Sequence, residues 1–169
     1  MSWVPMDRLM SMGNAPGMEP TLVDVAATTT AVIGAVVTQQ ELVNFFDRSF
    51  SRVATVLSDQ DIAIESPAFA RYHRPPAESV DLEVGFVTAR AVRPDGDVRA
   101  GSLPGGRVAR LVHQGGYDQL GASWGCLLSW IDAQGVTPGR DLWEVYVTEP
   151  SPHIDPATLR TELNWSIEG

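Results

Sequence analysis

The sequence predicts an α+β fold in which a strand–helix–strand–strand unit occurs twice. Three observations predict it: two amphipathic helical segments, short β-branched or alternating segments around them, and agreement between the two halves of the chain at an offset of 74 residues. Each unit would form a small antiparallel sheet with a helix on one face. Two units side by side would share a core, with both helices on one face of the sheet and a ligand groove on the other.

The first predicted unit spans about residues 21–90. Its first element, 22–38, is rich in Val, Ala and Thr, which favours a strand. The elements that follow are a helix over 40–59, a strand over 61–72, a break at Arg74-Pro75-Pro76, a strand over 80–89 and a loop over 90–106.

The second predicted unit spans about residues 104–169 and repeats this order. A strand over 107–113 leads through a Gly-Gly turn into a helix from Tyr117 to Ile131, which Gly135 terminates. The remaining elements are a strand over 141–148, a break at 149–152 and a strand over 159–167. Residues 1–20 are rich in Met, Gly and Pro, and we expect a flexible tail before a single domain over 21–169.

The offset aligns side chains of similar kind. The aligned pairs are Phe46 with Leu120, Phe50 with Trp124, Val53 with Leu127, Tyr72 with Tyr146, and Pro76 with Pro150. With five extra residues in the second loop, Phe86 aligns with Trp165. Because order, spacing and residue type agree together, we interpret the match as an internal duplication.

Composition excludes several classes of protein. The 169 residues hold 21 acidic and 12 basic side chains, a net charge of −9, which argues against a nucleic-acid-binding surface. Cys126 is the only cysteine, so an internal disulfide and a CxxC site are excluded. No apolar run is long enough for a transmembrane helix, and no signal peptide is recognisable. We therefore expect a cytoplasmic protein with no membrane partner.

Several segments resemble the GyrI-like small-molecule-binding domain, the effector-binding domain of many AraC-type and MerR-type bacterial regulators. The second half carries the stronger resemblance, in 103–117 (LPGGRVARLVHQGGY), 141–150 (DLWEVYVTEP) and 159–167 (LRTELNWSI). The first half fits more loosely, in 66–72 (SPAFARY) and 81–86 (DLEVGF). The resemblance implies a duplicated fold that binds small molecules, including several drugs. About twenty non-basic residues precede the repeat, which leaves no room for a helix-turn-helix reader, so we expect a stand-alone member.

Glu144 is the main candidate for a functional residue. Strand alternation puts Leu142, Glu144 and Tyr146 on one face, predicted to line the groove, and Trp143 and Val145 on the face predicted to pack under the helices. A carboxylate flanked by apolar groups is costly to bury unpaired, and a cationic ligand would offset that cost. In the family that the chain resembles, a glutamate in the matching strand contacts cationic aromatic ligands. An exposed glutamate, or one paired with an arginine such as Arg71, is the alternative.

Four aromatic residues complete the predicted ligand site. Tyr72 and Tyr146 are equivalent in the two repeats and are expected on the groove face, where their rings would hold flat or cationic ligands. Phe86 and Trp165 are also equivalent, and their side is left open between the groove and the helix-side core.

Other chemistry-bearing residues give weaker signals. Glu83 and Glu162 are equivalent acids that could lie at the groove rim, where a second carboxylate would allow acid–base chemistry. The histidines, at positions 73, 113 and 153, lack metal-ligand spacing, and Cys126 lacks an adjacent base. We therefore expect no metal and no cofactor.

Three functions remain open from the sequence. The first is binding of an aromatic or cationic molecule around Glu144, for sensing, sequestration or drug resistance. The second is a hydrolase of strained-ring (cyclopropanoid) natural products, in which Glu144 would activate water. The third is a protein-interaction role like that of the family's gyrase-inhibitory proteins. A homodimer formed through exposed strand edges also stays open.

Overall fold

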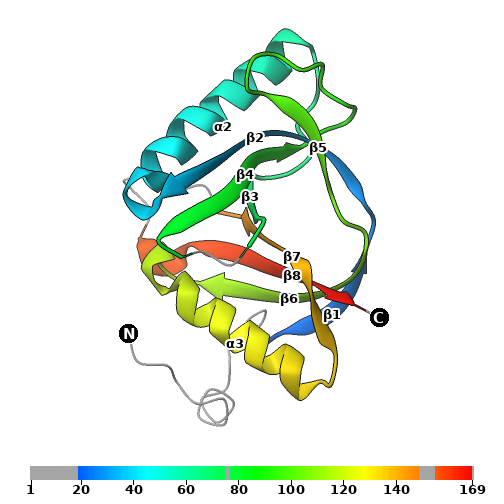
Figure 1. The fold of residues 1–169 in the computed structure, drawn as a ribbon, viewed down its shortest axis with the longest axis vertical. Coiled ribbons are helices and arrows are strands. Elements are labelled where there is room, and N and C mark those ends of the chain that lie inside the picture. The colour runs from blue at the N-terminus through cyan, green and yellow to red at the C-terminus, as the bar shows by residue number, and fades with distance from the viewer. Residues whose placement is uncertain (1–18, 75–76, 149–154, 169) are drawn as a thin grey trace.

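The computed structural model describes residues 19–74, 77–148 and 155–168 and shows an α+β fold (Figure 1). In these residues one antiparallel sheet of eight strands is covered by the helices α2 (Leu42–Asp59) and α3 (Leu120–Ala133). The strands are β1 (Thr21–Val25), β2 (Thr28–Thr38), β3 (Phe69–Tyr72), β4 (Ser79–Val87), β5 (Arg99–Leu103), β6 (Gly106–Gln114), β7 (Thr137–Tyr146) and β8 (Arg160–Glu168). The predicted fold class is confirmed.

The same order of elements occurs twice, as β1-β2-α2-β3-β4 and then β5-β6-α3-β7-β8. The sheet order β1-β6-β8-β7-β3-β4-β2-β5 places β7 and β3 side by side at the centre. There Ala70 pairs with Glu144, its equivalent at the offset found in the sequence. The approximate two-fold relation between the repeats therefore passes between these two residues.

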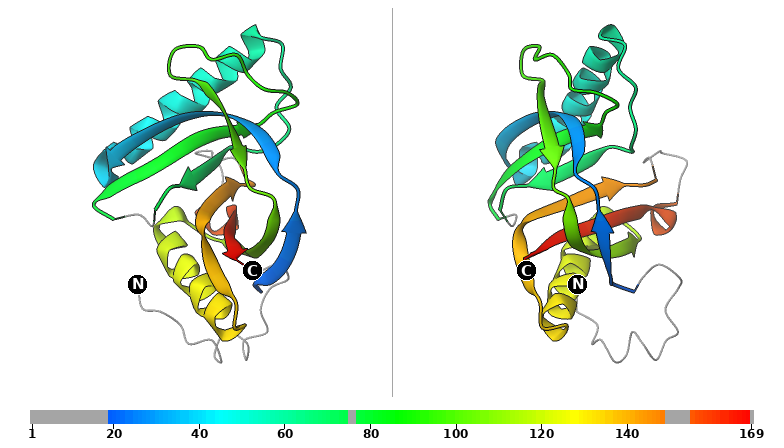
Figure 2. Two further views of the ribbon diagram at one scale, coloured as in Figure 1. Left: turned by 45° about the vertical axis from the view of Figure 1, so that its right-hand side comes forward. Right: turned by 90° about the vertical axis from the view of Figure 1, so that its right-hand side faces the viewer.

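The two edges of the sheet meet because the segments 21–38 and 99–114 each bend and pair with one another along their length. β1 pairs with β6 as far as Val25↔Gly106, and β2 continues the same antiparallel register with β5. A Cβ added to Gly105, at the bend of the second segment, would lie 2.6 Å from the backbone nitrogen of Ala27, so the close approach requires glycine. Figure 2 shows the resulting curl, in which β1 and β5 bridge the two halves of the sheet.

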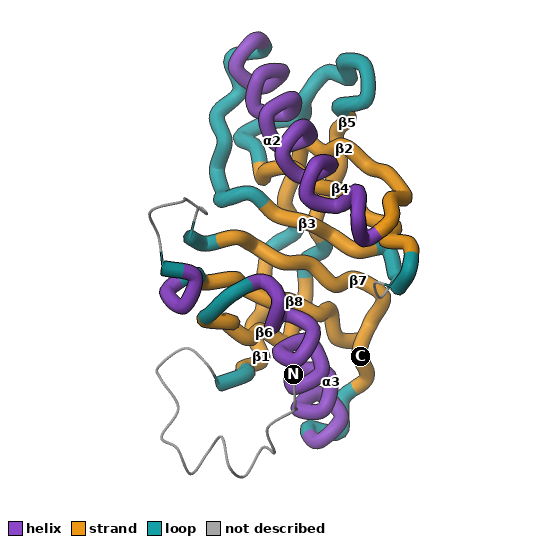
Figure 3. The backbone as a smooth tube through the Cα atoms, turned by 90° about the vertical axis from the view of Figure 1, so that its left-hand side faces the viewer, coloured by secondary structure: helices purple, strands orange, loops and turns teal. Residues whose placement is uncertain are grey.

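The two faces of the curled sheet carry separate cores. Both helices lie on one face, α2 over β2 and β4 and α3 over β6 and β7 (Figure 3). The face inside the curl holds a second buried cluster, made of Val32, Phe69, Leu103, Val108 and Trp143. Side chains therefore fill the concave side of the sheet.

The prediction that Leu142, Glu144 and Tyr146 face away from the helices is wrong. Trp143 and Val145, expected under the helices, belong to the cluster inside the curl. Leu142 and Tyr146 pack in the helix-side core, and Glu144 shares their face. Strand alternation separates the two sets correctly, but it carries no information on which set meets the helices.

Most predicted elements are confirmed, with three differences. Segment 22–38 forms two strands rather than one. Segment 61–72 is a strand only at its end, because Asp61 has a φ of 57° and Pro67 interrupts the remainder. The predicted loop 90–106 contains β5, which forms by pairing with β2.

Some predictions fall outside the described residues. These concern most of the N-terminal tail (1–18) and the breaks at 75–76 and 149–152. The predicted domain limits stay a prediction. Within the described ranges, neither helix combines the length and apolar character needed to cross a membrane.

Candidate functional site: a buried carboxylate among aromatic rings

Glu144 is a buried carboxylate near the middle of the sheet. Only 4% of the residue is exposed. Its strand pairs with β3 on one side and β8 on the other, so neighbouring backbone covers both flanks. Leu142 and Tyr146 share its face and pack in the helix-side core. An ionisable group thus lies in an otherwise largely apolar layer.

Side chains from both the helix layer and the sheet donate hydrogen bonds to this carboxylate. The indole Nε1–H of Trp124 in α3 donates to Oε1 of Glu144 over 3.0 Å. The hydroxyl of Tyr146 donates to Oε2 over 2.9 Å. No Lys, Arg or His lies within ion-pair distance of Glu144 among the residues that the structure describes. The carboxylate therefore has neutral donors but no counter-charge among them.

Burial shapes the protonation of this group and its neighbours. It raises the pKa of Glu144, while hydrogen bonds from Trp124, Tyr146 and Tyr72 oppose the rise. Burial, followed by the charge of Glu144, raises the pKa of Tyr72 and of Tyr146 well above the usual value. Both hydroxyls therefore stay protonated at neutral pH and available to donate. Since burial destabilises the ionised carboxylate, a bound cation would stabilise it.

Aromatic rings from both helices and from several strands surround Glu144. Together with Glu144 and Tyr72 they form what we call the carboxylate–aromatic cluster; its other members are Phe46, Phe50, Phe86, Tyr117, Trp124, Tyr146 and Trp165. The ring of Tyr146 lies at its centre, with centroid distances of 6.0 Å to Phe46, 6.3 Å to Phe50 and 5.8 Å to Tyr117. These rings are partly exposed, which leaves aromatic surface for a ligand.

The cluster contains equivalent aromatic pairs from the two repeats, which differ in one hydrogen bond. Each repeat packs a helix aromatic against a strand aromatic: Phe50 against Phe86 in a tilted pair at 5.8 Å, and Trp124 against Trp165 edge-to-face at 5.7 Å. These pairs are equivalent in the alignment of the halves. Phe50, however, lacks a hydrogen-bond donor at the position where Trp124 has its indole N–H. The cluster thus has two similar aromatic halves and a single hydrogen-bonded carboxylate.

Residues 18–168 match the family of the GyrI-like small molecule binding domain. The chain belongs to this family. Its fold is similar to the C-terminal domain of EcmrR, with a TM-score of 0.78 and 16% identity over 89% of this chain and 97% of that one. Against EcmrR in its complex with DNA, the TM-score is 0.79, and the match covers 95% of this chain but only 61% of the longer EcmrR chain, again at 16% identity.

Two further solved structures share the fold of this GyrI-like domain. SAV2435 bound to tetraphenylphosphonium has a TM-score of 0.63 and 16% identity over 90% of this chain and 95% of that one. A hydrolase from Listeria innocua has a TM-score of 0.61 and 11% identity over 96% of this chain and 98% of that one. No curated protein matches the sequence. At these identities the similarity concerns the fold alone.

The structure brings together the residues selected from the sequence of this GyrI-like domain. Tyr72, Leu142 and Tyr146 lie on the face of Glu144, in the helix-side core. Phe86 and Trp165, whose side was open, pack against the same core. The two alternatives for Phe86 and Trp165 were the side of Glu144 and the helix-side core. These are the same side of the sheet, because Glu144 faces the helices.

The alternative explanations for Glu144 are wrong. It is not exposed, and Arg71 lies on the opposite face, where it pairs with Glu83 at 3.2 Å and with Asp141. Glu83 is 3% exposed and also contacts Arg99 at 3.3 Å. Alternation along β4 puts it on the face inside the curl, so the idea of a second carboxylate beside Glu144 is wrong for Glu83.

Glu162 is likewise a structural acid rather than a neighbour of Glu144. It forms an ion pair with Arg110 at 3.3 Å and accepts a hydrogen bond from the Asn164 side-chain amide. Asn164 is buried and also accepts a hydrogen bond from Arg110. These contacts link β6 and β8 at the sheet rather than completing the carboxylate–aromatic cluster.

Sequence reasoning missed four members of the cluster: Phe46, Phe50, Tyr117 and Trp124. Each falls on an apolar helical stripe, and such a stripe is explained by core packing alone. One signal was available for Trp124, because a buried indole N–H needs an acceptor and the predicted core offered few. Glu144 is the acceptor that the structure supplies.

His113 takes a structural role. His113 is 3% exposed; its Nδ1 lies 2.6 Å from the Ser123 hydroxyl and its Nε2 lies 3.0 Å from the Gly116 carbonyl. The ring thereby connects β6 to α3 and to the turn before Tyr117. No group of three or more potential metal ligands gathers anywhere in the described ranges.

Proposed function

We propose that this GyrI-like domain binds an organic cation with aromatic substituents against Glu144. One observation carries the proposal: Glu144 is buried, holds hydrogen bonds only from neutral donors, and has no cationic partner among the described residues. An ionised carboxylate in that setting is destabilised, and a ligand cation would relieve the cost.

The surrounding rings support the same chemistry. Phe46, Phe50 and Tyr117 border Tyr146 and keep part of their surface exposed. Aromatic faces attract cations, most strongly where water is excluded, and they also bury flat apolar substituents. A delocalised cation that carries phenyl groups satisfies both the carboxylate and the rings. SAV2435, which shares the fold, is bound to tetraphenylphosphonium, a cation of this kind.

Calorimetric titration of the purified protein tests the proposal. Tetraphenylphosphonium should bind, and triphenylphosphine oxide, which is aromatic but uncharged, should bind more weakly. In Glu144→Gln the preference for the cation should fall by about tenfold or more, because the charge is lost while the amide keeps nearly the same shape. Equal affinities of wild type and Glu144→Gln for the cation would contradict the proposal.

A hydrolase is the second candidate, favoured by the raised pKa of Glu144. Burial moves this carboxyl toward the range in which a carboxylate accepts a proton from water near neutral pH. A strained-ring, cyclopropane-containing alkylator would be the substrate, with water adding across the opened ring. If turnover occurs, Glu144→Gln should abolish it while leaving substrate affinity within about threefold. The protein-interaction role stays a prediction that rests on net charge.

A further inference from the structure

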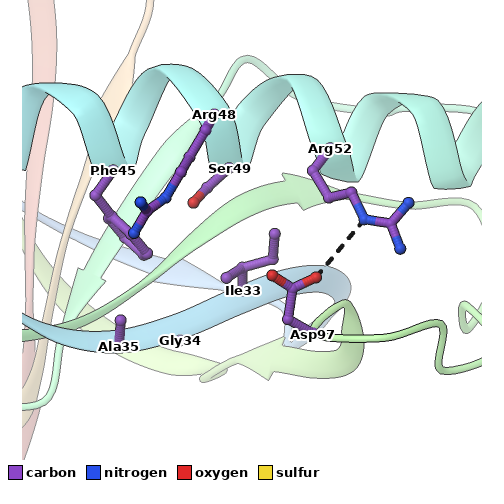
Figure 4. Close-up of a pocket in the computed structure, with 8 residues that line it drawn as sticks. All are labelled: Ile33, Gly34, Ala35, Phe45, Arg48, Ser49, Arg52 and Asp97. Carbon is purple, nitrogen blue, oxygen red and sulfur yellow. Dashed lines mark ion pairs between the residues drawn. The ribbon is translucent and has the colours of Figure 1, made fainter.

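A pocket of about 400 Å³ lies between α2 and the outer edge of β2 (Figure 4). Its walls include Ile33 and Ala35 from β2, Phe45, Arg48 and Arg52 from α2, and Asp97 from the loop before β5. None of these residues belongs to the carboxylate–aromatic cluster. The pocket is therefore a separate feature of the fold.

The strand edge at this pocket is open among the described residues. β4 follows one side of β2 to its end, whereas β5 covers only Thr28–Val32 on the other side. The carbonyl of Thr29 accepts a hydrogen bond on the β4 side, from the residue after β4. By alternation, the backbone groups of Gly34 and Val36 point to the outer edge. Such an edge is able to pair with a further strand.

One large apolar side chain at this edge is exposed. Val36 is 60% exposed. On the helix side of the edge, Phe45 and Ser49 of α2 line the pocket and are buried, with Ser49 2% exposed. The edge thus offers backbone hydrogen bonds together with the exposed Val36 on one face and the partly exposed Ala35 on the other.

Arg48 supplies a positive charge in this pocket. Its guanidinium carbon lies 5.7 Å from the centroid of the Phe45 ring. Figure 4 shows its side chain turned toward Phe45 and Ala35, whereas Arg52 turns toward Asp97. Arg52 is paired with Asp97 at 3.6 Å. Arg48 forms no ion pair in the part of the chain that the structure describes, and its charge acts at longer range on the Glu41 carboxylate, whose pKa it helps to lower. The guanidinium therefore keeps room for a carboxylate at ion-pair distance.

We propose that the outer edge of β2 binds an extended peptide segment that carries a carboxylate side chain. The peptide adds a strand by pairing with the backbone of Gly34 and Val36, and its carboxylate pairs with Arg48. A second copy of the chain fits less well. Pairing two β2 edges about Ala35 would bring the two pockets together, and with them two like-charged Arg48 groups.

A fluorescent peptide of alternating valine and glutamate, added to the purified protein and followed by anisotropy, tests this proposal. Val36→Pro removes an outward N–H and should be tolerated, because proline is compatible with an unpaired strand edge. It should weaken peptide binding at least about tenfold. Arg48→Gln should weaken it about tenfold, and Arg140→Gln, at an exposed position outside the pocket, should leave it unchanged.

Peptide variants keep the test decisive if Val36→Pro fails to fold. Glutamine in place of glutamate should reproduce the loss seen with Arg48→Gln, and N-methylation of alternate residues should abolish binding. Absence of binding to the wild-type protein, or binding that N-methylation leaves unchanged, would overturn the proposal. So would a wild-type dimer in sedimentation that Val36→Pro dissociates, because a second copy would then occupy the edge. Affinity for tetraphenylphosphonium is expected to be unchanged in these variants, so the two proposals fail independently.

Discussion

Glu144 and Ala70 occupy equivalent positions in the two repeats and face each other across the central strand pair. The approximate two-fold axis that relates the repeats passes between them. At this position the first repeat has a methyl group and the second has the carboxylate of Glu144. A ligand at this site would meet two similar sets of rings and a single charge, which fixes where its cationic part must lie.

The hydrogen bond that Trp124 donates to Glu144 should contribute measurably to the stability of the fold. Trp124→Phe keeps an aromatic ring, as at the equivalent Phe50, but removes the 3.0 Å hydrogen bond to the carboxylate. We expect a loss of about 1.5–3 kcal/mol in the free energy of unfolding at neutral pH, typical of a hydrogen bond to a charged group. Urea denaturation measures this loss.

Trp165→Phe is the matched control for that experiment. Trp165 packs edge-to-face with Trp124, and its Nε1–H donates to the Gly139 carbonyl over 2.9 Å. The same truncation then removes a hydrogen bond to a neutral acceptor, for which about 0.5–1.5 kcal/mol is expected. A loss for Trp165→Phe equal to or greater than that for Trp124→Phe would argue that the carboxylate adds nothing to the Trp124 contact.

Affinity for an organic cation should increase with pH. A cation stabilises the ionised form of Glu144, so binding lowers its pKa and is linked to proton release. Because burial raises the pKa of Glu144 in the free protein, the increase should extend above the usual range for glutamate and then level off. Tetraphenylphosphonium titrations over a pH series check this, with triphenylphosphine oxide as the uncharged control. A flat profile for the cation would be inconsistent with recognition by Glu144.

The stability of the free protein should show the opposite pH dependence at this residue. The pKa of Glu144 is higher in the folded than in the unfolded chain, so the folded state binds more protons between the two values. The contribution of Glu144 to the free energy of unfolding therefore falls as pH rises through that window. Glu144→Gln lacks this term, so it should gain stability relative to wild type from acidic to neutral pH. Parallel stability curves for the two proteins would show that the pKa is not raised.

Glu83 should be important for stability and not for ligand binding. It is buried between Arg71 at 3.2 Å and Arg99 at 3.3 Å, and it connects β3, β4 and β5 on the face inside the curl. Glu83→Gln should lower the free energy of unfolding by about 3 kcal/mol, because it removes a negative charge that neutralises the partly buried Arg71. Cation affinity, measured under conditions in which the variant is folded, should stay within about twofold of wild type.

Glu162→Gln is the control for Glu83, because the two are equivalent in the repeats. The side chain of Glu162 is 25% exposed, as against 4% for Glu83, and it has one arginine partner. A loss of at most about 1 kcal/mol is expected for a pair so accessible to solvent. If the two variants lost equal stability, burial would not be what makes Glu83 important.

Much of this fold follows from local patterns in the sequence. Helical spacing predicts α2 and α3, and the repeat offset predicts that Ala70 and Glu144 are equivalent, which the register of β3 and β7 bears out geometrically. Alternation along β7 correctly groups Leu142, Glu144 and Tyr146. These features depend on neighbouring residues or on comparison of the halves, both of which a single sequence contains.

The side on which the cluster lies could not be predicted in the same way. It depends on the curl of the sheet, which β1 and β5 close by long-range pairing. That curl creates an interior for Trp143 and Phe69 and leaves the helix side to Glu144. β5 was missed for the same reason, because Arg99–Leu103 has little strand character without its pairing to β2.

A crystal structure of the protein with tetraphenylphosphonium tests the central claim most directly. The account predicts the cation between α2 and α3, with its charged centre facing the carboxylate of Glu144 and its phenyl groups against Tyr146 and the neighbouring rings. A cation bound elsewhere, with the carboxylate–aromatic cluster unchanged from the free protein, would contradict it.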